Sequence, residues 1–405
     1  MIIPSILIVP GKYNNNKLIS QIPVNESADF TVSRLTTATR VNSNGLINLV
    51  TNNVPRIDYL NQSCPALLVE AAATNQIRNN SMVGAVTGSS STLPTNWGSL
   101  FFGGLTRQIV ATGVINGIQY IDIRLSGTAT EAGGSIFFDT ITASSGQVWT
   151  SSFWFDIISQ PNPANGFRFQ AQNRLATVFV SDQFATLTPA GFIRYQNTTT
   201  VPSGVDNIRP CLNVQLTVNQ FYDFTIRIGY PQMEQSSFAT SVIPTTTGTG
   251  SRDADVISVS SISSLIGQNE GTVYIEYNMQ TLGVEGYAIR LVAASFENSV
   301  HIRRSTANLV TLELRALGSN VFSQTLAATG FVKAAIAYKS GDIAAFVNGT
   351  PAGSTSTSAF TFGASFTSVN LGTFGTAAFL NDRIRAAALY TTRLSNNELQ
   401  LLTKL

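Results

Sequence analysis

Hydrophobic and polar side chains alternate with a period of two through most of this 405-residue chain. In residues 272–279 one parity holds Val273, Ile275, Tyr277 and Met279. Successive side chains of a β-strand point to opposite faces, whereas a helix repeats every 3.6 residues. The same alternation recurs in segments 119–125, 167–172, 223–230, 287–293, 310–317 and 332–338. These segments therefore predict β-strands with one buried face.

Clusters of Gly, Asn, Ser and Pro separate the alternating segments and predict turns. Asn348-Gly349 follows residues 342–347 and predicts a tight hairpin, because a type I′ turn needs positive φ at both central positions. Ser395 and Glu398 form a capping box, which predicts a short C-terminal helix. Regularly spaced strands build sandwiches or barrels, so the chain is expected to be all-β.

The charge and the apolar stretches of the chain disfavour nucleic acids and membranes as partners. Charged residues make up 11% of the sequence, against roughly 25% in typical soluble domains. The net charge is +2, without a run of either sign, whereas nucleic-acid binding needs clustered cations. No apolar stretch reaches the roughly 18 residues that span a bilayer. We therefore expect neither nucleic-acid binding nor membrane insertion.

Two shifts in composition predict domain boundaries. Residues 244–251 are almost all small or polar and indicate a linker, and a weaker boundary lies near Asn79-Asn80. The apolar opening is short and is broken by Pro4 and Pro10, so it predicts a docking segment and not a signal peptide. The expected parts are a β-rich docking and connector segment at 1–79, a jelly-roll β-sandwich at 80–245 and a second sandwich at 246–405.

The residues that most enzymes need are scarce. His301 is the one histidine, and no G-x-S-x-G motif is present to place a serine nucleophile. Cys64 and Cys211 lie far apart and are expected to be two free, buried thiols. One histidine and two distant cysteines do not make a zinc site, and a phosphate-binding P-loop is missing. We expect a protein that is not an enzyme.

Acidic residues leave two alternatives open. Glu270 and Glu276 share a strand face, as a glycosidase pair would, but they also fit outward-facing solubilising residues. Calcium is the one cofactor left open, because oxygen ligands need no motif. Its candidate ligands, which turn chemistry explains equally, are Asp342, Asn348, Asn381 and Asp382.

Short motifs in a fixed order resemble tailed-bacteriophage structural and fibre (spike) proteins. Eight short motifs resemble the N-terminal module of those proteins: Phe30-Thr-Val-Ser-Arg34, Ala38-Thr-Arg-Val-Asn42, Gly45-Leu-Ile47, Asn53-Val-Pro-Arg56, Asp58-Tyr59, Cys64-Pro65, Leu67-Leu-Val-Glu70 and Thr74-Asn75. Four later motifs resemble the stretch that those proteins carry between a carbohydrate-module-like jelly roll and a concanavalin A-like domain: Tyr230-Pro-Gln-Met-Glu234, Phe238-Ala-Thr-Ser241, Ile243-Pro-Thr245 and Ser251-Arg-Asp-Ala-Asp-Val256. The last domain is similar to laminin-G-like sandwiches through Lys333-Ala-Ala-Ile-Ala-Tyr338, Phe346-Val-Asn-Gly349, Asn370-Leu-Gly372, Arg385-Ala-Ala-Ala-Leu-Tyr390 and Leu394-Ser-Asn-Asn-Glu398.

The resemblance implies a virion surface protein of the head or tail, made in the host cytoplasm. Such a fibre or spike is an oligomer, by analogy a homotrimer, whose N-terminus binds other virion proteins and whose sandwiches bind host glycans. The docking role falls on the apolar opening and on Tyr13, Lys17 and Leu18, because an exposed apolar face is a liability on a free monomer. Within the N-terminal motifs, the basic and acidic residues predict an ion-pair cluster that holds strands in register, namely Arg34, Arg40, Arg56, Asp58 and Glu70.

Aromatic residues beside turns are the predicted glycan contacts, because the C–H face of a sugar packs on a ring. The candidates are Trp97, Phe101, Phe102 and Tyr195. The alternative is that these rings fill the core of the first sandwich. Two other functions also stay open, namely a purely structural capsid or tail decoration protein and, with less support, a capsule-degrading glycosidase.

Overall fold

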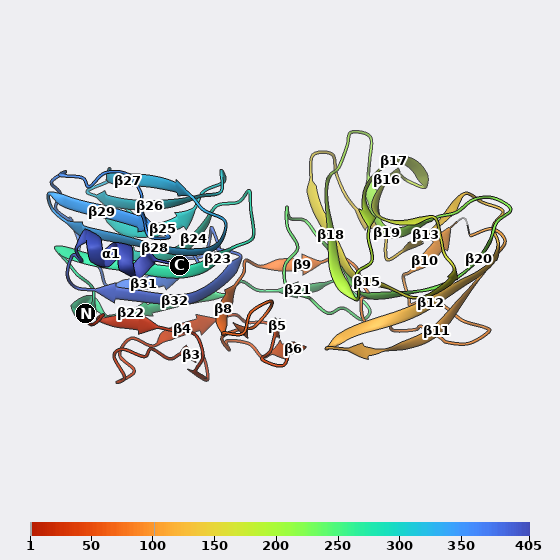
Figure 1. Cartoon of the computed structure of the whole chain (residues 1–405), viewed down its shortest axis with the longest axis horizontal. Coiled ribbons are helices and arrows are strands. Elements are labelled where there is room, and N and C mark those ends of the chain that lie inside the picture. The colour runs from red at the N-terminus through yellow and green to blue at the C-terminus, as the bar shows by residue number, and fades with distance from the viewer. Residues whose placement is uncertain (1, 101) are drawn as a thin grey trace. The chain divides into compact units, whose positions relative to one another are not determined.

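The computed structural model describes residues 2–100 and 102–405 (Figure 1). The chain forms two compact units. Unit 1 contains the residues up to Ala72 together with Asp253–Leu405, and unit 2 is the intervening segment Ala73–Arg252. Unit 2 is thus inserted into unit 1. This differs from the three-part division expected from composition, because the first 72 residues pack with the C-terminal sandwich and do not form a segment of their own.

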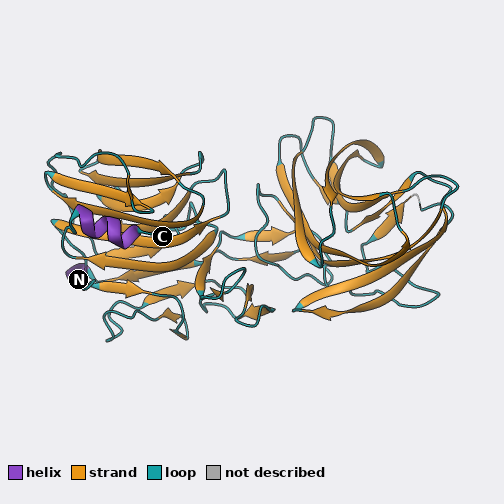
Figure 2. Cartoon of the chain, in the orientation of Figure 1, coloured by secondary structure: helices purple, strands orange, loops and turns teal. Residues whose placement is uncertain are grey.

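Unit 1 is a sandwich of two large antiparallel sheets, with a small third sheet and a terminal helix (Figure 2). The eight-stranded sheet holds β30 (Thr350–Pro351), β29 (Asp342–Val347), β28 (Gly330–Lys339), β23 (Glu270–Met279), β32 (Asp382–Tyr390), β8 (Ala66–Val69) and β7 (Ile57–Asp58), with β1 (Ile6–Ile8) paired to β32. The nine-stranded sheet holds β2 (Tyr13–Asn14), β3 (Lys17–Leu18), β4 (Phe30–Ser33), β22 (Val256–Ser260), β31 (Ser368–Leu371), β24 (Gly286–Val292), β25 (Ser299–Arg304), β26 (Leu309–Ala316) and β27 (Ser319–Ala327). The third sheet pairs β5 (Ala38–Val41) with β6 (Ile47–Val50).

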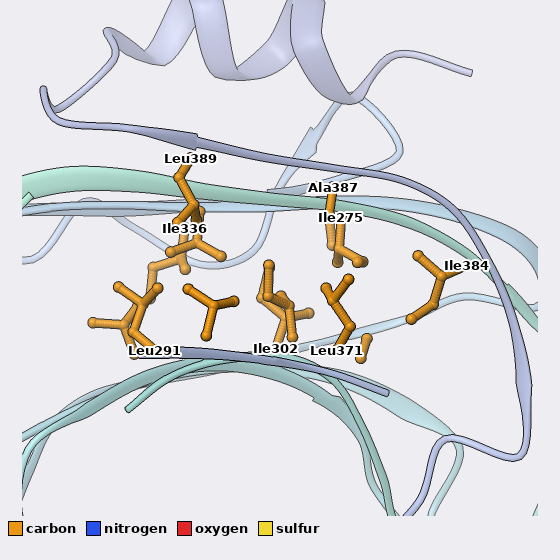
Figure 3. Packing of buried hydrophobic residues seen from close by; sticks show 14 of the residues in the cluster. Ile275, Leu291, Ile302, Ile336, Leu371, Ile384, Ala387 and Leu389 are labelled. Atoms are coloured by element: carbon orange, nitrogen blue, oxygen red, sulfur yellow. The ribbon is translucent and has the colours of Figure 1, made fainter. Parts of the chain in front are cut away.

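The core of unit 1 lies between the two large sheets. Figure 3 shows Ile275, Ile336 and Leu389 of the eight-stranded sheet facing Leu291, Ile302 and Leu371 of the nine-stranded sheet. The parity predicted for residues 272–279 is confirmed, since the four side chains of one parity are all buried in this core. Burial of such side chains is the main favourable term in folding.

The apolar N-terminus is part of this core. Ile6 and Ile8 are buried, and β1 pairs with β32 in antiparallel register. Ile3 by contrast is 76% exposed. The alternation Ile6–Leu7–Ile8 therefore gives a strand that covers the edge of a sandwich, and the apolar surface expected for docking is in large part used within unit 1 itself.

Unit 2 is a sandwich of two sheets, and its first and last strands form a separate ribbon. One sheet holds β10 (Gly98–Leu100), β13 (Gly133–Phe137), β19 (Asn207–Gln215), β16 (Gly166–Leu175) and β17 (Val178–Leu187), with β14 (Ile141–Thr142) paired to β19. The other holds β11 (Leu105–Ile115), β12 (Ile118–Thr128), β20 (Phe221–Glu234), β15 (Val148–Asn162) and β18 (Ile193–Thr200). The ribbon pairs β9 (Ala73–Asn75) with β21 (Gly250–Arg252).

Phenylalanine rings dominate the core of unit 2. Phe153 lies at the centre, with its ring centroid 4.3 Å from that of Phe169 and 5.5 Å from that of Phe138. Phe155 contacts Phe167 at 5.2 Å. Tilted and edge-to-face contacts of this kind add to the stabilisation from burial. They connect the two sheets and fix how β15 lies against β16.

A buried ion-pair cluster organises the start of unit 1. The Asp255 carboxylate binds Arg34 at 2.8 Å and also binds Arg56, whose guanidinium in turn binds Glu70 at 2.7 Å. Arg34, Arg56 and Glu70 are three of the five residues predicted to cluster. Asp58 instead pairs with Arg383, and Arg40 lies outside the cluster against the Tyr13 ring.

Two local predictions are confirmed. Asn348 and Gly349 both have positive φ and join β29 to β30. Helix α1 (Asn396–Thr403) begins after Ser395, whose hydroxyl and backbone N–H form the predicted capping box with Glu398. The helix packs through Leu399 on a second, smaller core cluster of unit 1. Among the described residues, no helix is long and apolar enough to cross a membrane.

Candidate functional site

A pocket of about 390 Å³ opens in unit 2, where β15 leads into β16 and β17 leads into β18. Its polar lining comes from Asp156 and Gln160. Its apolar lining comes chiefly from Ile157, Phe167, Leu187 and Pro189. Small-ligand sites are concave and combine apolar walls with a few polar groups; this pocket contains both kinds of group, and its exposed lining is more polar than apolar.

An irregularity in β15 shapes the pocket. The register between β15 and β20 shifts between Ile157 and Ser159, and such bulges redirect neighbouring side chains. The Asp156 carboxylate accepts a hydrogen bond from the backbone N–H of Ile157 at 2.9 Å, which fixes the orientation of the acid. Phe167 forms the inner wall through its contact with Phe155 in the core.

Two half-buried rings and an arginine form what we call the aromatic shelf: Tyr120, Phe192 and Arg227. The Cζ atom of Arg227 lies 3.8 Å from the Tyr120 ring centroid and 5.8 Å from that of Phe192. Phe192 lies directly over Gly229, where a Cβ atom would come within 2.7 Å of the ring. The glycine therefore makes room for this aromatic side chain from the β17–β18 loop.

Ion pairing holds the shelf in place. Asp122 binds Arg227 through two hydrogen bonds of 2.7 and 2.8 Å, and this bidentate contact raises the pKa of the arginine. The negative charge of Asp156 also acts on Arg227 in the same direction. Asp156 thus belongs to both features, since it lines the pocket and interacts electrostatically with the shelf.

Tyr195 fixes the loop that carries Phe192. Its hydroxyl donates to the backbone oxygen of Thr188 at 2.7 Å, next to Pro189 of the pocket. Burial, with a smaller effect of Asp156, raises the pKa of Tyr195, so the hydroxyl stays a donor. Of the three predicted glycan contacts that the structure describes, Tyr195 is the one that lies beside this pocket.

The other predicted glycan contacts have different positions. Trp97 is 8% exposed, its indole N–H donates to Asn79 O at 2.8 Å, and its ring contacts Phe138. Its ring is therefore used by the core, as the alternative interpretation holds. Phe102 is half-buried and packs against the same core, while Phe101 lies outside the described residues.

The residues predicted to dock on the virion differ in exposure. Tyr13 and Lys17 are exposed on the hairpin of β2 and β3. Leu18 is fully buried in the core of unit 1, because its side chain faces inward from β3. Leu18 is consequently a core residue and has no surface to offer a partner.

Glu270 and Glu276 lie beside basic side chains, and the two cysteines differ in exposure. Glu270 pairs with Lys339 at 3.2 Å, whereas Glu276 lies near Lys333 and Arg385. Cys211 is buried and free as expected, but Cys64 is exposed, which corrects the expectation of two buried thiols. Cys64 is followed by Pro65 in a short turn-rich segment, where alternation gave no burial signal.

The residues considered for calcium are engaged within the protein. Asp342 binds Arg393 at 2.8 Å, and Asp382 accepts two backbone hydrogen bonds and lies 3.3 Å from Arg304. The Asn348 and Asn381 side chains accept hydrogen bonds from backbone N–H groups. Within residues 2–100 and 102–405, no cluster of three or more His, Cys, Asp or Glu groups is placed to hold a metal.

Sequence reasoning missed the shelf and Asp156. Tyr120 and Asp122 do share the polar parity of the strand predicted at 119–125, so their common face was visible. Their partners Phe192 and Arg227 lie about 70 and 100 residues further along the chain. Only the pairing of β12 with β20 brings Asp122 opposite Arg227.

Comparison with known proteins gives similarity of fold to solved structures. No family model matches the chain, and no curated protein matches it either. The sialidase-associated carbohydrate-binding module CBM40 of Ruminococcus gnavus, solved with α2,3-sialyllactose, is 18% identical over 36% of this chain and 91% of its own, with a TM-score of 0.31. A structure of a CBM4 module is 18% identical over 40% of this chain and 99% of its own, with a TM-score of 0.28. The leech intramolecular trans-sialidase is 18% identical over 34% of this chain and 24% of its own, with a TM-score of 0.28. At these identities and TM-scores the likeness carries no argument about what this chain binds.

Proposed function

We propose that this protein binds glycans through the pocket and aromatic shelf of unit 2. The observation that carries the proposal is the pocket itself, which sets apolar walls beside the carboxylate of Asp156 and the amide of Gln160. Sugars present C–H faces that pack on rings and hydroxyls that need hydrogen-bond partners, and this lining offers both. Phe192 and Tyr120 extend the apolar surface beside it.

The proposal is one of binding without turnover. Asp156 is the one carboxylate among the residues that line the pocket. Glycoside hydrolysis by the usual mechanisms needs two carboxyl groups on either side of the scissile bond. Glu270 and Glu276, the acidic pair of the sequence, belong to unit 1 and have basic neighbours there.

We further propose that the protein is a fibre or spike component of a tailed-phage virion. The motifs that resemble phage structural proteins support this, and several of them provide the buried cluster around Asp255. Labelled antibodies against the protein, applied to purified particles in electron microscopy, would test the assignment. Label on the head or tail is expected, and particles without label would overturn it.

A glycan array probed with the purified full-length protein tests the binding proposal. The array should present neutral and acidic oligosaccharides, because the pocket offers both apolar walls and hydrogen-bonding groups. Phe192→Ala and Gln160→Ala should each weaken the affinity for any glycan that binds by about tenfold, since each removes a contact worth roughly 1–2 kcal/mol. Phe221→Ala is the matched control, because Phe221 is an exposed ring on β20 of the same unit. A folded protein that binds no glycan, or binding unaffected by both variants, contradicts the proposal.

A further inference from the structure

A second group of aromatic and basic side chains lies on the outer face of the nine-stranded sheet of unit 1. We call it the arginine patch and define it as Tyr287, Arg290, Phe296, Arg315 and Phe374. Arg290 projects from β24 and Arg315 from β26, while Phe296 and Phe374 come from the loops after β24 and after β31. Their strand neighbours Leu291 and Leu314 face the core, so the two arginines face outward.

Arg290 is the unusual member of the patch. Its side chain is nearly buried, with 6% of the residue exposed, and its Cζ lies 4.2 Å from the Phe374 ring centroid and 5.0 Å from that of Phe296. Within the described part of the chain its guanidinium has no hydrogen-bond or ion-pair partner, and the Nε atom is completely buried. Burial lowers the pKa of Arg290. Burial of the Nε–H group without a hydrogen-bond partner is costly, because nothing replaces the water that this group has lost.

Two of the nearby carboxylates, those of Glu285 and Glu313, are engaged with other side chains. Glu313 accepts hydrogen bonds of 2.8 Å from both His301 and Arg303, and Glu285 binds Arg303 at 2.9 Å. Glu297 is exposed on the loop of Phe296, and no described residue pairs with it. Among the described residues, Arg290 therefore lacks a carboxylate partner, although Glu285, His301, Arg303 and Glu313 form a hydrogen-bonded network on the same sheet.

A second guanidinium approaches the same ring. The Cζ atom of Arg315 lies 4.9 Å from the Phe296 centroid, and its side chain donates to Gly318 O at 2.7 Å. The Nε atom of Arg315 is also buried without a partner in the described residues. Phe296 itself is 36% exposed. Two arginines with unused donors thus flank a ring that is open to solvent.

We propose that the arginine patch binds a saccharide that bears a carboxylate, such as a uronic or other acidic sugar. The guanidinium is a planar fork that matches a carboxylate in bidentate geometry, and stacking on a ring fixes its plane in advance. The exposed face of Phe296 supplies a surface for the C–H face of the sugar. An acidic peptide would use the guanidinium but would not need this ring, so the sugar is the better match.

The experiment uses the full-length protein labelled with ¹⁵N at arginine and titrated with sodium glucuronate. A shift of the Arg290 Nε–H resonance, assigned by its loss in Arg290→Gln, is expected on titration. Glucose has the same ring without the carboxylate and should give no shift. N-acetylglutamate has two carboxylates and no sugar ring, and it should bind at least about tenfold more weakly than glucuronate. Equal binding of N-acetylglutamate and glucuronate would overturn the saccharide assignment, and no response to glucuronate would overturn the site.

Two variants separate the site from a general effect of arginine or of folding. Phe296→Leu removes the exposed ring and keeps an apolar side chain, and it should weaken glucuronate binding about tenfold while the protein stays folded. Arg385→Gln is the matched control, because Arg385 also stacks on a ring, Phe331 at 4.4 Å, but has Glu276 as a partner. Binding retained by Phe296→Leu, or lost in Arg385→Gln, counts against the patch. Phe192→Ala in unit 2 should leave this titration unchanged, so failure of the pocket proposal and failure of this one are distinguishable.

Discussion

The guanidinium of Arg34 binds the carboxylate of Asp255 at 2.8 Å, although 221 residues separate them along the chain. Both side chains are buried. Arg56 binds the same carboxylate, and the backbone N–H of Glu70 donates to it at 3.0 Å. Asp255 follows the segment inserted as unit 2, so this cluster joins the two separate parts of unit 1.

Replacing Asp255 with Asn should destabilise unit 1 strongly. The change leaves Arg34 and Arg56 buried with too little negative charge, and breaking a buried ion pair from one side costs about 3–5 kcal/mol. Urea unfolding followed by circular dichroism measures this. Trp97, Trp149 and Trp154 all belong to unit 2, so the tryptophan fluorescence transition should not move. Asp223→Asn is the control, because its pair with Arg124 is exposed and should contribute little. Equal stability of Asp255→Asn and the unchanged protein would show that the cluster is dispensable.

The N-terminal strand gives a second prediction. Ile8→Ala should destabilise unit 1 by about 2–4 kcal/mol, because it leaves a cavity in a packed core. Ile3→Ala removes a similar side chain from an exposed position and should have almost no effect. Thermal unfolding of the two variants compares them directly. Equal melting temperatures would mean that β1 does not contribute to the sandwich.

The strands and the helix could be predicted because their signals are local. Side-chain alternation identified β12, β16, β20, β23, β24, β26 and β28, and the capping box identified α1. These features depend on neighbours a few residues apart. The joining of residues up to Ala72 with Asp253–Leu405 depends instead on contacts such as Arg34 with Asp255, which local patterns do not encode. For the same reason three members of the ion-pair cluster were predicted, but its central acid was not.

The candidate site was harder to predict than the fold. Aromatic residues beside turns are equally suited to a binding surface and to a core, and Trp97 shows the second outcome. Whether a ring is exposed depends on the opposite sheet and on small residues beneath it, as with Phe192 above Gly229. Both determinants are distant in sequence. Among the predicted contacts with a described position, Tyr195 alone lies beside the pocket.

The capping box of α1 gives a third prediction. Ser395→Ala should destabilise unit 1 by about 1 kcal/mol, because the first turn of the helix loses its side-chain acceptor. Gln400→Ala is the control on the same helix, where the side chain is exposed and alanine is a good helix former. Circular dichroism melts of the two variants test this. A melting temperature for Ser395→Ala equal to or above that of Gln400→Ala contradicts it.

The hairpin at Asn348-Gly349 gives a fourth prediction. Gly349 has φ of 78°, and a side chain in this left-handed region costs roughly 1–2 kcal/mol. Gly349→Ala should therefore destabilise unit 1 by about that amount, although a Cβ there would meet Lys404 at 3.6 Å and Gln400 O at 3.9 Å, which are ordinary contact distances. Asn348→Gly should be tolerated, because glycine adopts the same φ freely, apart from the loss of the hydrogen bond from Lys333 N. Chemical denaturation of the two variants measures the free energy of unfolding, and a Gly349→Ala protein as stable as the unchanged one would contradict the predicted backbone strain.

Glu313 gives a prediction about pH. Burial alone would raise the pKa of this carboxyl, but hydrogen bonds from His301 and Arg303 outweigh burial and lower it to about 2. A carboxyl whose pKa is depressed in the folded state contributes stability above its unfolded pKa, and that contribution disappears as the pH falls from about 4.5 towards 2.

At pH 7 Glu313→Gln should therefore be less stable than the unchanged protein by on the order of 2 kcal/mol. Near pH 2 the two proteins should nearly converge, because Glu313 is then about half protonated and only a small part of its stabilising contribution remains. Burial also lowers the pKa of His301, so the ring is neutral at pH 7. Because His301 is hydrogen-bonded to Glu313, the pH dependence reports the two coupled groups together. Urea unfolding at a series of pH values measures the difference, and a difference that stays constant from pH 7 to pH 2 would show that the ion pairs of Glu313 do not stabilise the fold.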